Sequence, residues 1–270
     1  MLASLGKRLA PLLLSIIASG ALAQTPKTVF LQDLTWTELR AEINAGKTTI
    51  IIPIGGTEQS GPDIALGKHN ARVRVLSQRI AQTLGNALVA PVIAYVPEGS
   101  YAPPTAHMRF PGTITIPDDA FEKTLESAAN SFKIHGFLNI VFLGDHGGYQ
   151  NDLKLVVHRL NRSWSGTKAR AFVPPAYYGT SSRGFAQILR KRGYHDAEIG
   201  THAGLADTSL LLAVAPSMVR LDRLRSGPTP GAAEGVYGDP RRASAELGQL
   251  GVEAIISRTV AAIRKDTAGR

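Results

Sequence analysis

Short apolar runs alternate with segments of helical period along almost the whole chain, and this alternation constrains the fold more than any other feature. Apolar runs of four to seven residues are typical of buried strands, and the segments between them are long enough for crossover helices. The expected strands are 48–55, 87–96, 138–144, 169–177 and, as a shorter candidate, 112–116. The expected helices are 35–46, 70–85, 118–136, 206–219 and 243–265. The pattern predicts an α/β fold with a mostly parallel central sheet.

Two glycine-rich loops follow predicted strands, at the edge where ligands bind in open α/β sheets. The first, "GGTEQSGPDIALGKHN", contains Glu58 and His69, and the second, "GDHGGYQND", contains Asp145 and His146. Carboxylates and imidazoles are ligands that zinc and manganese accept in proteins. Glycine-rich turns with one acid and one histidine are also common as plain connectors, so the residues alone leave both interpretations open.

Two further stretches carry candidate polar groups. "THAGLADTSLLL" (201–212) places His202 and Asp207 at the start of a predicted helix, and "TAHMRFPGTITI" (105–116) places His107 before a Pro-Gly turn. Taken singly, the first is an ordinary helix start, where Asp207 would favour the helix dipole, and the second is an ordinary turn. A long segment rich in glycine and proline, 223–242, predicts a surface or interface loop.

The first residues have the features of a signal peptide. Lys7 and Arg8 form a basic start, a short apolar run follows, and "ALA" precedes Gln24. We therefore predict a signal peptide at 1–23 and a single domain at 24–270, exported to the periplasm or secreted, with no stable membrane insertion after cleavage. The alternative is an uncleaved N-terminal anchor, for which the apolar run is short.

Composition narrows the chemistry. The chain of 270 residues has no cysteine, so a metal ion can be bound only by His, Asp and Glu side chains. Its net charge is +9, but the basic residues are spread out and no aromatic residues are interleaved with them. We therefore expect no nucleic-acid partner.

Four stretches in one order resemble the motifs of the creatininase (creatinine amidohydrolase) family: "GGTEQSGPDIALGKH", "HMRFPGT", "GDHGGYQ" and "HAGLADTS". "GVYGDPRRASAELG" is similar to a late segment of that family, and the resemblance runs from about residue 30 to the C-terminus. It implies a three-layer α/β/α domain that hydrolyses a non-peptide, often cyclic, C–N amide bond in a small molecule. It also implies one or two divalent ions, zinc or manganese, and a homo-oligomer, commonly a hexamer.

The resemblance also assigns metal ligands. Glu58 and His146 match ligands of the family, and His69 stands where the family has a bridging aspartate. Ser60 and Asp63 replace histidines, so a second ion would lack its usual ligands. We expect one ion per chain, bound by Glu58, His69 and His146, with Asp207 as a possible fourth ligand. Asp63 is a weaker candidate.

Catalytic roles follow from the same resemblance. His202 matches a family histidine near the substrate, which could orient the substrate or move protons, and His107 could complete the pocket. Asp145, next to His146, is the expected acceptor that holds the His146 imidazole.

Two other functions remain open. The changes at Ser60, Asp63 and His69 are compatible with an exported binding or scaffold protein that has lost catalysis. A hydrolase of esters or lactones is the third alternative, because water activation by a metal does not choose between C–N and C–O bonds.

Overall fold

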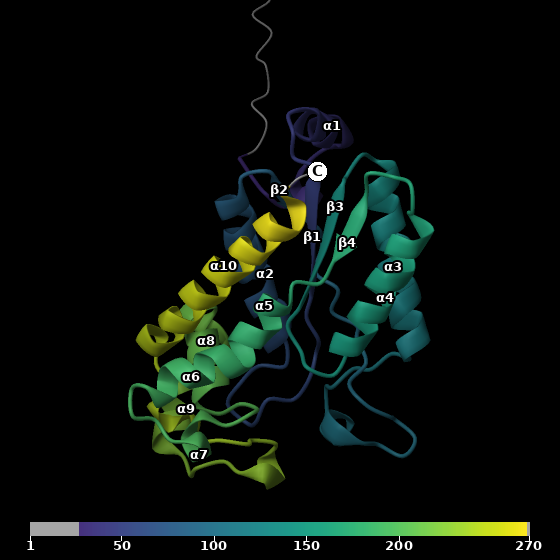
Figure 1. Ribbon diagram of the computed structural model, residues 1–270. Coiled ribbons are helices and arrows are strands. Elements are labelled where there is room, and N and C mark those ends of the chain that lie inside the picture. Colours follow the sequence, from purple (N-terminus) through teal and green to yellow (C-terminus); the bar gives the residue numbers. More distant parts are fainter. Residues whose placement is uncertain (1–26, 269–270) are drawn as a thin grey trace, which may run out of the picture.

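The structure, a computed structural model, describes residues 27–268, and its centre is a parallel four-stranded sheet with the order β2-β1-β3-β4 (Figure 1). The strands are β1 (Thr49–Ile54), β2 (Ala87–Val89), β3 (Asn139–Gly144) and β4 (Arg170–Phe172). All three strand pairings are parallel, as the alternating sequence pattern predicts. In β1 and β3 the register runs from Thr49 opposite Asn139 to Ile54 opposite Gly144, so both strands end at the same edge.

Two predicted strands are shorter than expected, and the candidate at 112–116 forms none. Pro91 follows the end of β2, and it has no N–H group with which to continue the ladder. Pro175 follows the end of β4 and begins helix α5 (Pro175–Gly179), because the fixed φ of proline suits the first helical turn.

Helices cover both faces of the sheet and make a three-layer α/β/α arrangement (Figure 1). One face carries α3 (Asp118–Ile134) and α4 (Gln150–Ser163). The other carries α2 (Lys68–Leu84), α8 (Leu205–Val214) and α10 (Ala245–Thr267). The remaining α-helices are α1 (Trp36–Asn44), α6 (Phe185–Arg190), α7 (Asp196–Ile199) and α9 (Leu221–Ser226).

The side chains of β1 show how the sequence builds two cores. Ile51 packs with α2, α8 and α10 in one buried cluster, whereas Ile50, Ile52 and Ile54 pack with α3 and α4 in the other. This division follows from the two-residue period of a strand, and burial on both faces explains why the run is apolar throughout.

Helix α2 begins at Lys68, two residues before the predicted helix, so His69 lies in its first turn and not in the preceding loop. No helix within residues 27–268 has the length and apolar character needed to cross a bilayer. The predicted signal peptide lies outside the described residues, so the boundaries 1–23 and 24–270 remain predictions.

Candidate metal centre

Glu58 lies in the loop after β1, and its fully buried carboxylate is surrounded by four imidazoles. Oε1 is 2.7 Å from Nε2 of His69 and 3.7 Å from Nδ1 of His202. Oε2 is 3.1 Å from Nε2 of His107 and 3.5 Å from Nε2 of His146. The structure therefore brings together five of the eight residues that the sequence proposed for the site, namely Glu58 and the four histidines.

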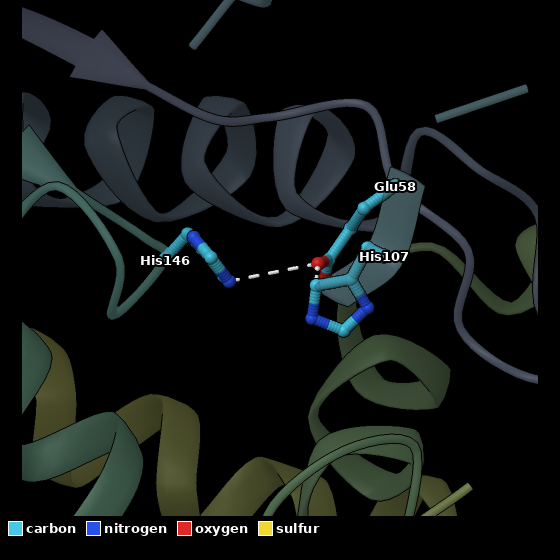
Figure 2. Close-up of side chains that lie close together, drawn as sticks. All are labelled: Glu58, His107 and His146. Carbon is cyan, nitrogen blue, oxygen red and sulfur yellow. Dashed lines mark ion pairs between the residues drawn. The ribbon is translucent and has the colours of Figure 1, made fainter. Parts of the chain in front are cut away.

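Within this cluster, Glu58, His107 and His146 form a compact group in which one ligand atom from each residue lies within 4.8 Å of the others. Figure 2 shows the Glu58 carboxylate beside His107, with His146 facing both from the opposite side. Oε2 of Glu58 is buried and has no hydrogen-bond partner among the described residues. A buried carboxylate oxygen that faces imidazole nitrogens fits a divalent cation.

Asp145 holds His69 and not His146, which corrects the expected contact. Its Oδ2 is 2.7 Å from Nδ1 of His69 and accepts a hydrogen bond from Nε of Arg72 at 2.8 Å. Its Oδ1 accepts from the Tyr177 hydroxyl at 2.8 Å. Both ring nitrogens of His69 thus lie 2.7 Å from a carboxylate oxygen, Nδ1 from Asp145 and Nε2 from Glu58, and Nη2 of Arg72 lies 3.1 Å from Nδ1.

Asp207 is the counter-ion of two buried cations, which corrects its expected role as a fourth metal ligand. Its two oxygens lie 2.5 Å from Nζ of Lys68 and 2.5 Å from Nη1 of Arg72. Oδ2 also accepts from the backbone N–H of Ala203 at 3.1 Å, and Ala203 has a φ of 53°. A hydrogen bond of this kind helps to hold a non-glycine residue in the left-handed region.

Asp63, the weaker ligand candidate, lies 3.3 Å from Nε of Arg223. Within the described residues it makes no ion pair with an imidazole. It is therefore placed outside the cluster around Glu58.

The buried carboxylates of the cluster are held in the charged form. Burial favours the neutral carboxyl, but Lys68 and the nearby imidazoles lower the pKa of Glu58 far below its usual range. Burial also raises the pKa of Asp145, but the charge of Arg72 outweighs it, so the pKa is lowered. At Asp207 the charges of Lys68 and Arg72 outweigh burial in the same way and lower the pKa. Three charged carboxylates, Lys68 and Arg72 are thus buried together around His69.

Three of the imidazoles near Glu58, those of His107, His146 and His202, are held in the neutral form. Burial, and then the charge of His69, lowers the pKa of His146 to about 3. Burial, and then Lys68, lowers the pKa of His202 to about 4, and burial also lowers the pKa of His107. Neutral imidazole has one nitrogen lone pair, which a metal ion requires.

Gln59, which the sequence reasoning missed, fixes two of these rings. Its amide oxygen accepts from the Gly61 N–H at 2.9 Å, so the amide nitrogen points to Nδ1 of His107 at 2.9 Å. Nδ1 of His107 is therefore an acceptor, and the ring proton lies on Nε2. The backbone carbonyl oxygen of Gln59 is 3.0 Å from Nε2 of His202, and this acceptor places the His202 proton on Nε2.

Lys68 and Arg72 were also missed by the sequence reasoning, although their spacing of four residues places both on the same face of α2, next to His69.

Glu98 is the fourth site residue that the sequence reasoning missed. It is 3 % exposed, its two oxygens have no hydrogen-bond partner among the described residues, and Oε2 is 3.6 Å from Nδ1 of His146. Burial and the neighbouring Glu58 raise the pKa of Glu98 to about 9.

The cluster opens into a cavity of about 820 Å³. Helices α5, α6, α7 and α8 and the turn that follows α5 contribute its walls, among them Tyr178, Ser182 and Arg183, and Tyr237 from the 223–242 segment also lines it. The described part of the chain thus contains a concave, mixed polar and apolar site at the carboxyl edge of the sheet, where a ligand is expected in this fold.

The buried His202 predicts a pH dependence of stability. Its pKa of about 4 in the folded protein lies below the ordinary value of 6.5, so the unfolded chain binds more protons between these values. The free energy of unfolding should therefore rise from pH 4 to 6.5, with His202 contributing on the order of 3 kcal/mol. Urea titrations of the metal-stripped protein across this range measure the effect. His202→Gln, which keeps an N–H for the Gln59 carbonyl, should show a smaller rise; an equal rise would contradict the prediction.

The chain is similar to several known proteins. The family described as Creatininase: creatinine amidohydrolase matches residues 32–263. Creatinine amidohydrolase of Pseudomonas putida is 26 % identical over 89 % of this chain and 98 % of its own length. The mycofactocin precursor peptide peptidase of Mycolicibacterium smegmatis is 28 % identical over 74 % of this chain and 78 % of its own. A solved mutant creatininase of the Zn-Zn type superposes with a TM-score of 0.74 at 25 % identity, over 90 % of this chain and 100 % of that one.

Proposed function

Because the chain belongs to the creatininase family, we propose that it is a metal-dependent hydrolase that cleaves a non-peptide C–N amide bond, cyclic in its natural substrate, in a small molecule. The observation that carries the proposal is the Glu58 carboxylate, which is buried, has an oxygen without a hydrogen bond among the described residues and faces the neutral imidazoles of His146 and His202. A relative of similar length is named for amide hydrolysis, which supports the type of bond.

We propose that Glu58, His69 and His146 would hold the ion, since Glu58 and His146 match ligands of the family and His69 stands where the family has a bridging ligand. With an ion bound beside Glu58, Asp145 would keep the His69 proton on Nδ1 and leave the Nε2 lone pair to the ion. A carboxylate behind a ligating imidazole is the usual arrangement at metal sites. His107 belongs to the compact group, but the Gln59 amide donates to its Nδ1 and leaves a proton on Nε2. His107 is therefore better suited to donate a hydrogen bond than to bind the ion.

His107 and His202 would act on the substrate. The Nε2 proton of His107 faces the cluster, where it can be passed to the nitrogen that leaves when an amide bond is cleaved. His202 directs Nδ1, an acceptor in this tautomer, toward the same space, where it can accept a proton. The two rings are 4.5 Å apart between centroids, so one donor and one acceptor would serve the same reacting group.

The ion would be zinc or manganese, and we propose one ion per chain. Imidazole and carboxylate suit both metals, and a zinc form of a solved relative supports zinc. A divalent ion supplies Lewis acidity, which polarises a carbonyl group and makes water more acidic. Ser60, at a position that the family gives to histidine, has a buried hydroxyl without a hydrogen bond among the described residues, and a hydroxyl is a poor ligand for a second ion.

Removal of the metal is the direct test. We expect chelation to abolish hydrolysis across a panel of lactams, imides, formamides, lactones and a dipeptide, and we expect added zinc or manganese to restore it, because the charged cluster lacks another Lewis acid. The panel also separates the alternatives. Turnover of lactones alone would identify an ester hydrolase. No turnover by the metal-loaded protein would refute the enzyme and favour a binding protein.

We also propose that the protein acts after export and as a homo-oligomer, with a hexamer as the specific expectation. The features of the N-terminal sequence and the family resemblance support these two points. A periplasmic or secreted chain that begins at Gln24, and the mass of the purified protein in solution, are the measurements that test them.

A further inference from the structure

Glu98 is a buried carboxylate at the metal centre that neither the sequence motifs nor the roles described above explain. It is 3 % exposed, and neither oxygen has a hydrogen-bond partner among the described residues. A buried polar group left without partners costs about 1–3 kcal/mol, and more when it is charged. Such a group in a native fold requires an explanation.

The surrounding backbone makes room for this carboxylate. A Cβ atom at Gly56 would lie 2.5 Å from Oε1 of Glu98, and Gly56 has a φ of 144°, which favours glycine. The backbone N–H of Glu98 donates to Oγ1 of Thr115 at 3.0 Å, and the Thr115 hydroxyl donates to the carbonyl oxygen of Gly99. The loop that contains Glu58 and the segment that contains Glu98 are thus shaped to hold the carboxylate next to the cluster.

Nδ1 of His146 has two neighbours of opposite kind. The Gly148 N–H, at 3.2 Å, is a donor and favours a ring with its proton on Nε2. Oε2 of Glu98 lies 3.6 Å from Nδ1, just beyond hydrogen-bond distance, and an acceptor that moves closer to this nitrogen favours a ring with its proton on Nδ1. Only the second tautomer leaves the Nε2 lone pair, which faces Glu58, available to an ion.

We propose that Glu98 is a positioning residue of the metal centre, whose carboxyl oxygen Oε2 accepts the Nδ1 hydrogen of His146 and so frees Nε2 of that ring for the cation. The inference rests on the proposed function, because it requires a metal ion at Glu58. Glu98, at 3.6 Å from Nδ1 of His146, would then have the role that Asp145 has for His69 at 2.7 Å, so each ligating imidazole would have its own carboxyl group. Removal of a carboxyl group that holds a ligating imidazole typically lowers metal affinity about 10- to 100-fold.

The test compares Glu98→Ala and Glu98→Gln with the natural protein. Zinc affinity is measured by competition with a chromophoric chelator on the purified chain. The His146 tautomer is read from ¹⁵N-histidine NMR of the zinc-loaded protein. Glu126→Gln is the matched control, because it makes the same chemical change on α3, where Glu126 pairs with Arg159 away from the site.

We expect Glu98→Ala to weaken zinc binding about 10- to 100-fold and to remove the Nδ1–H signal of His146. Glu98→Gln should lose less, since its amide oxygen can still accept, and Glu126→Gln should bind as the natural protein does. Unchanged affinity in both Glu98 variants would overturn the proposal. Weaker affinity with an unchanged Nδ1–H signal would also overturn it, because Glu98 would then act on the ion itself. Failure of the natural protein to bind zinc would instead refute the metal centre, and with it the proposed function.

Discussion

Glu58→Gln should reduce the bound metal from about one ion per chain to near none and abolish hydrolysis, because it removes the one carboxylate that every imidazole of the cluster faces. We expect affinity to fall by at least about 100-fold, since even residues behind the ligands contribute about 10- to 100-fold. Metal content by mass spectrometry and a chelator competition measure the change.

The same exchange at Glu126 on α3 is the control for Glu58→Gln and should leave metal content intact. Lys68 loses its contact with Glu58 at 3.3 Å but keeps Asp207, so the variant should still fold. Metal content equal to that of the natural protein in folded Glu58→Gln would show that the ion, if any, lies elsewhere.

Asp207→Asn should destabilise the fold by about 3 kcal/mol while leaving metal content unchanged. Removing one partner of a buried ion pair costs about 3–5 kcal/mol, and the lower figure applies because Lys68 keeps Glu58 and Arg72 keeps Asp145. Urea unfolding and metal analysis of the same preparations test both parts.

Asp196→Asn provides a matched comparison for Asp207→Asn, because Asp196 pairs with Arg190 where both side chains are exposed. Such a surface pair contributes about 0–1 kcal/mol, so this variant should unfold close to the natural protein. Loss of the metal without loss of stability in Asp207→Asn would restore Asp207 to the ligand set.

Local sequence signals were sufficient for the centre of the sheet. β1 and β3 coincide closely with apolar runs, and the glycine-rich loops that follow them do meet at one edge because the strands are parallel and in register. His69 and His146 could therefore be placed near Glu58 before any coordinates were known.

Other elements carried no comparable signal. Helix α4 was not predicted, and its N-cap residue is Tyr149, which makes no side-chain capping bond. The lengths of β2 and β4 were overestimated, because the apolar runs continue through Pro91 and Pro174 whereas the backbone hydrogen-bond ladders of the two strands stop before these prolines.

The errors at the site concern pairings between distant segments. Asp207 was expected to bind the ion or to favour the helix dipole, and only the fold shows that Lys68 and Arg72, 139 and 135 residues earlier, take both of its oxygens. Asp145 was assigned to its neighbour in sequence, whereas its partner His69 is 76 positions away. Glu98 lies outside the family-like motifs, and its place depends on how the chain returns to the sheet after β2.

The irregular segment 223–242, expected to be a surface or interface loop, also forms part of the site. The Gly235 carbonyl oxygen accepts from the Gln59 amide at 3.3 Å, and Tyr237 exchanges backbone hydrogen bonds with His202. Gly235 leaves no room for a side chain, since a Cβ there would lie 2.1 Å from Oε1 of Gln59. Length changes here, which irregular segments ordinarily tolerate, would disturb two imidazoles together. Grafting this stretch from one relative onto another would therefore transfer the orientation of the His107 and His202 rings as a unit. Substrate preference can thus diverge through a segment that contributes no reactive group of its own.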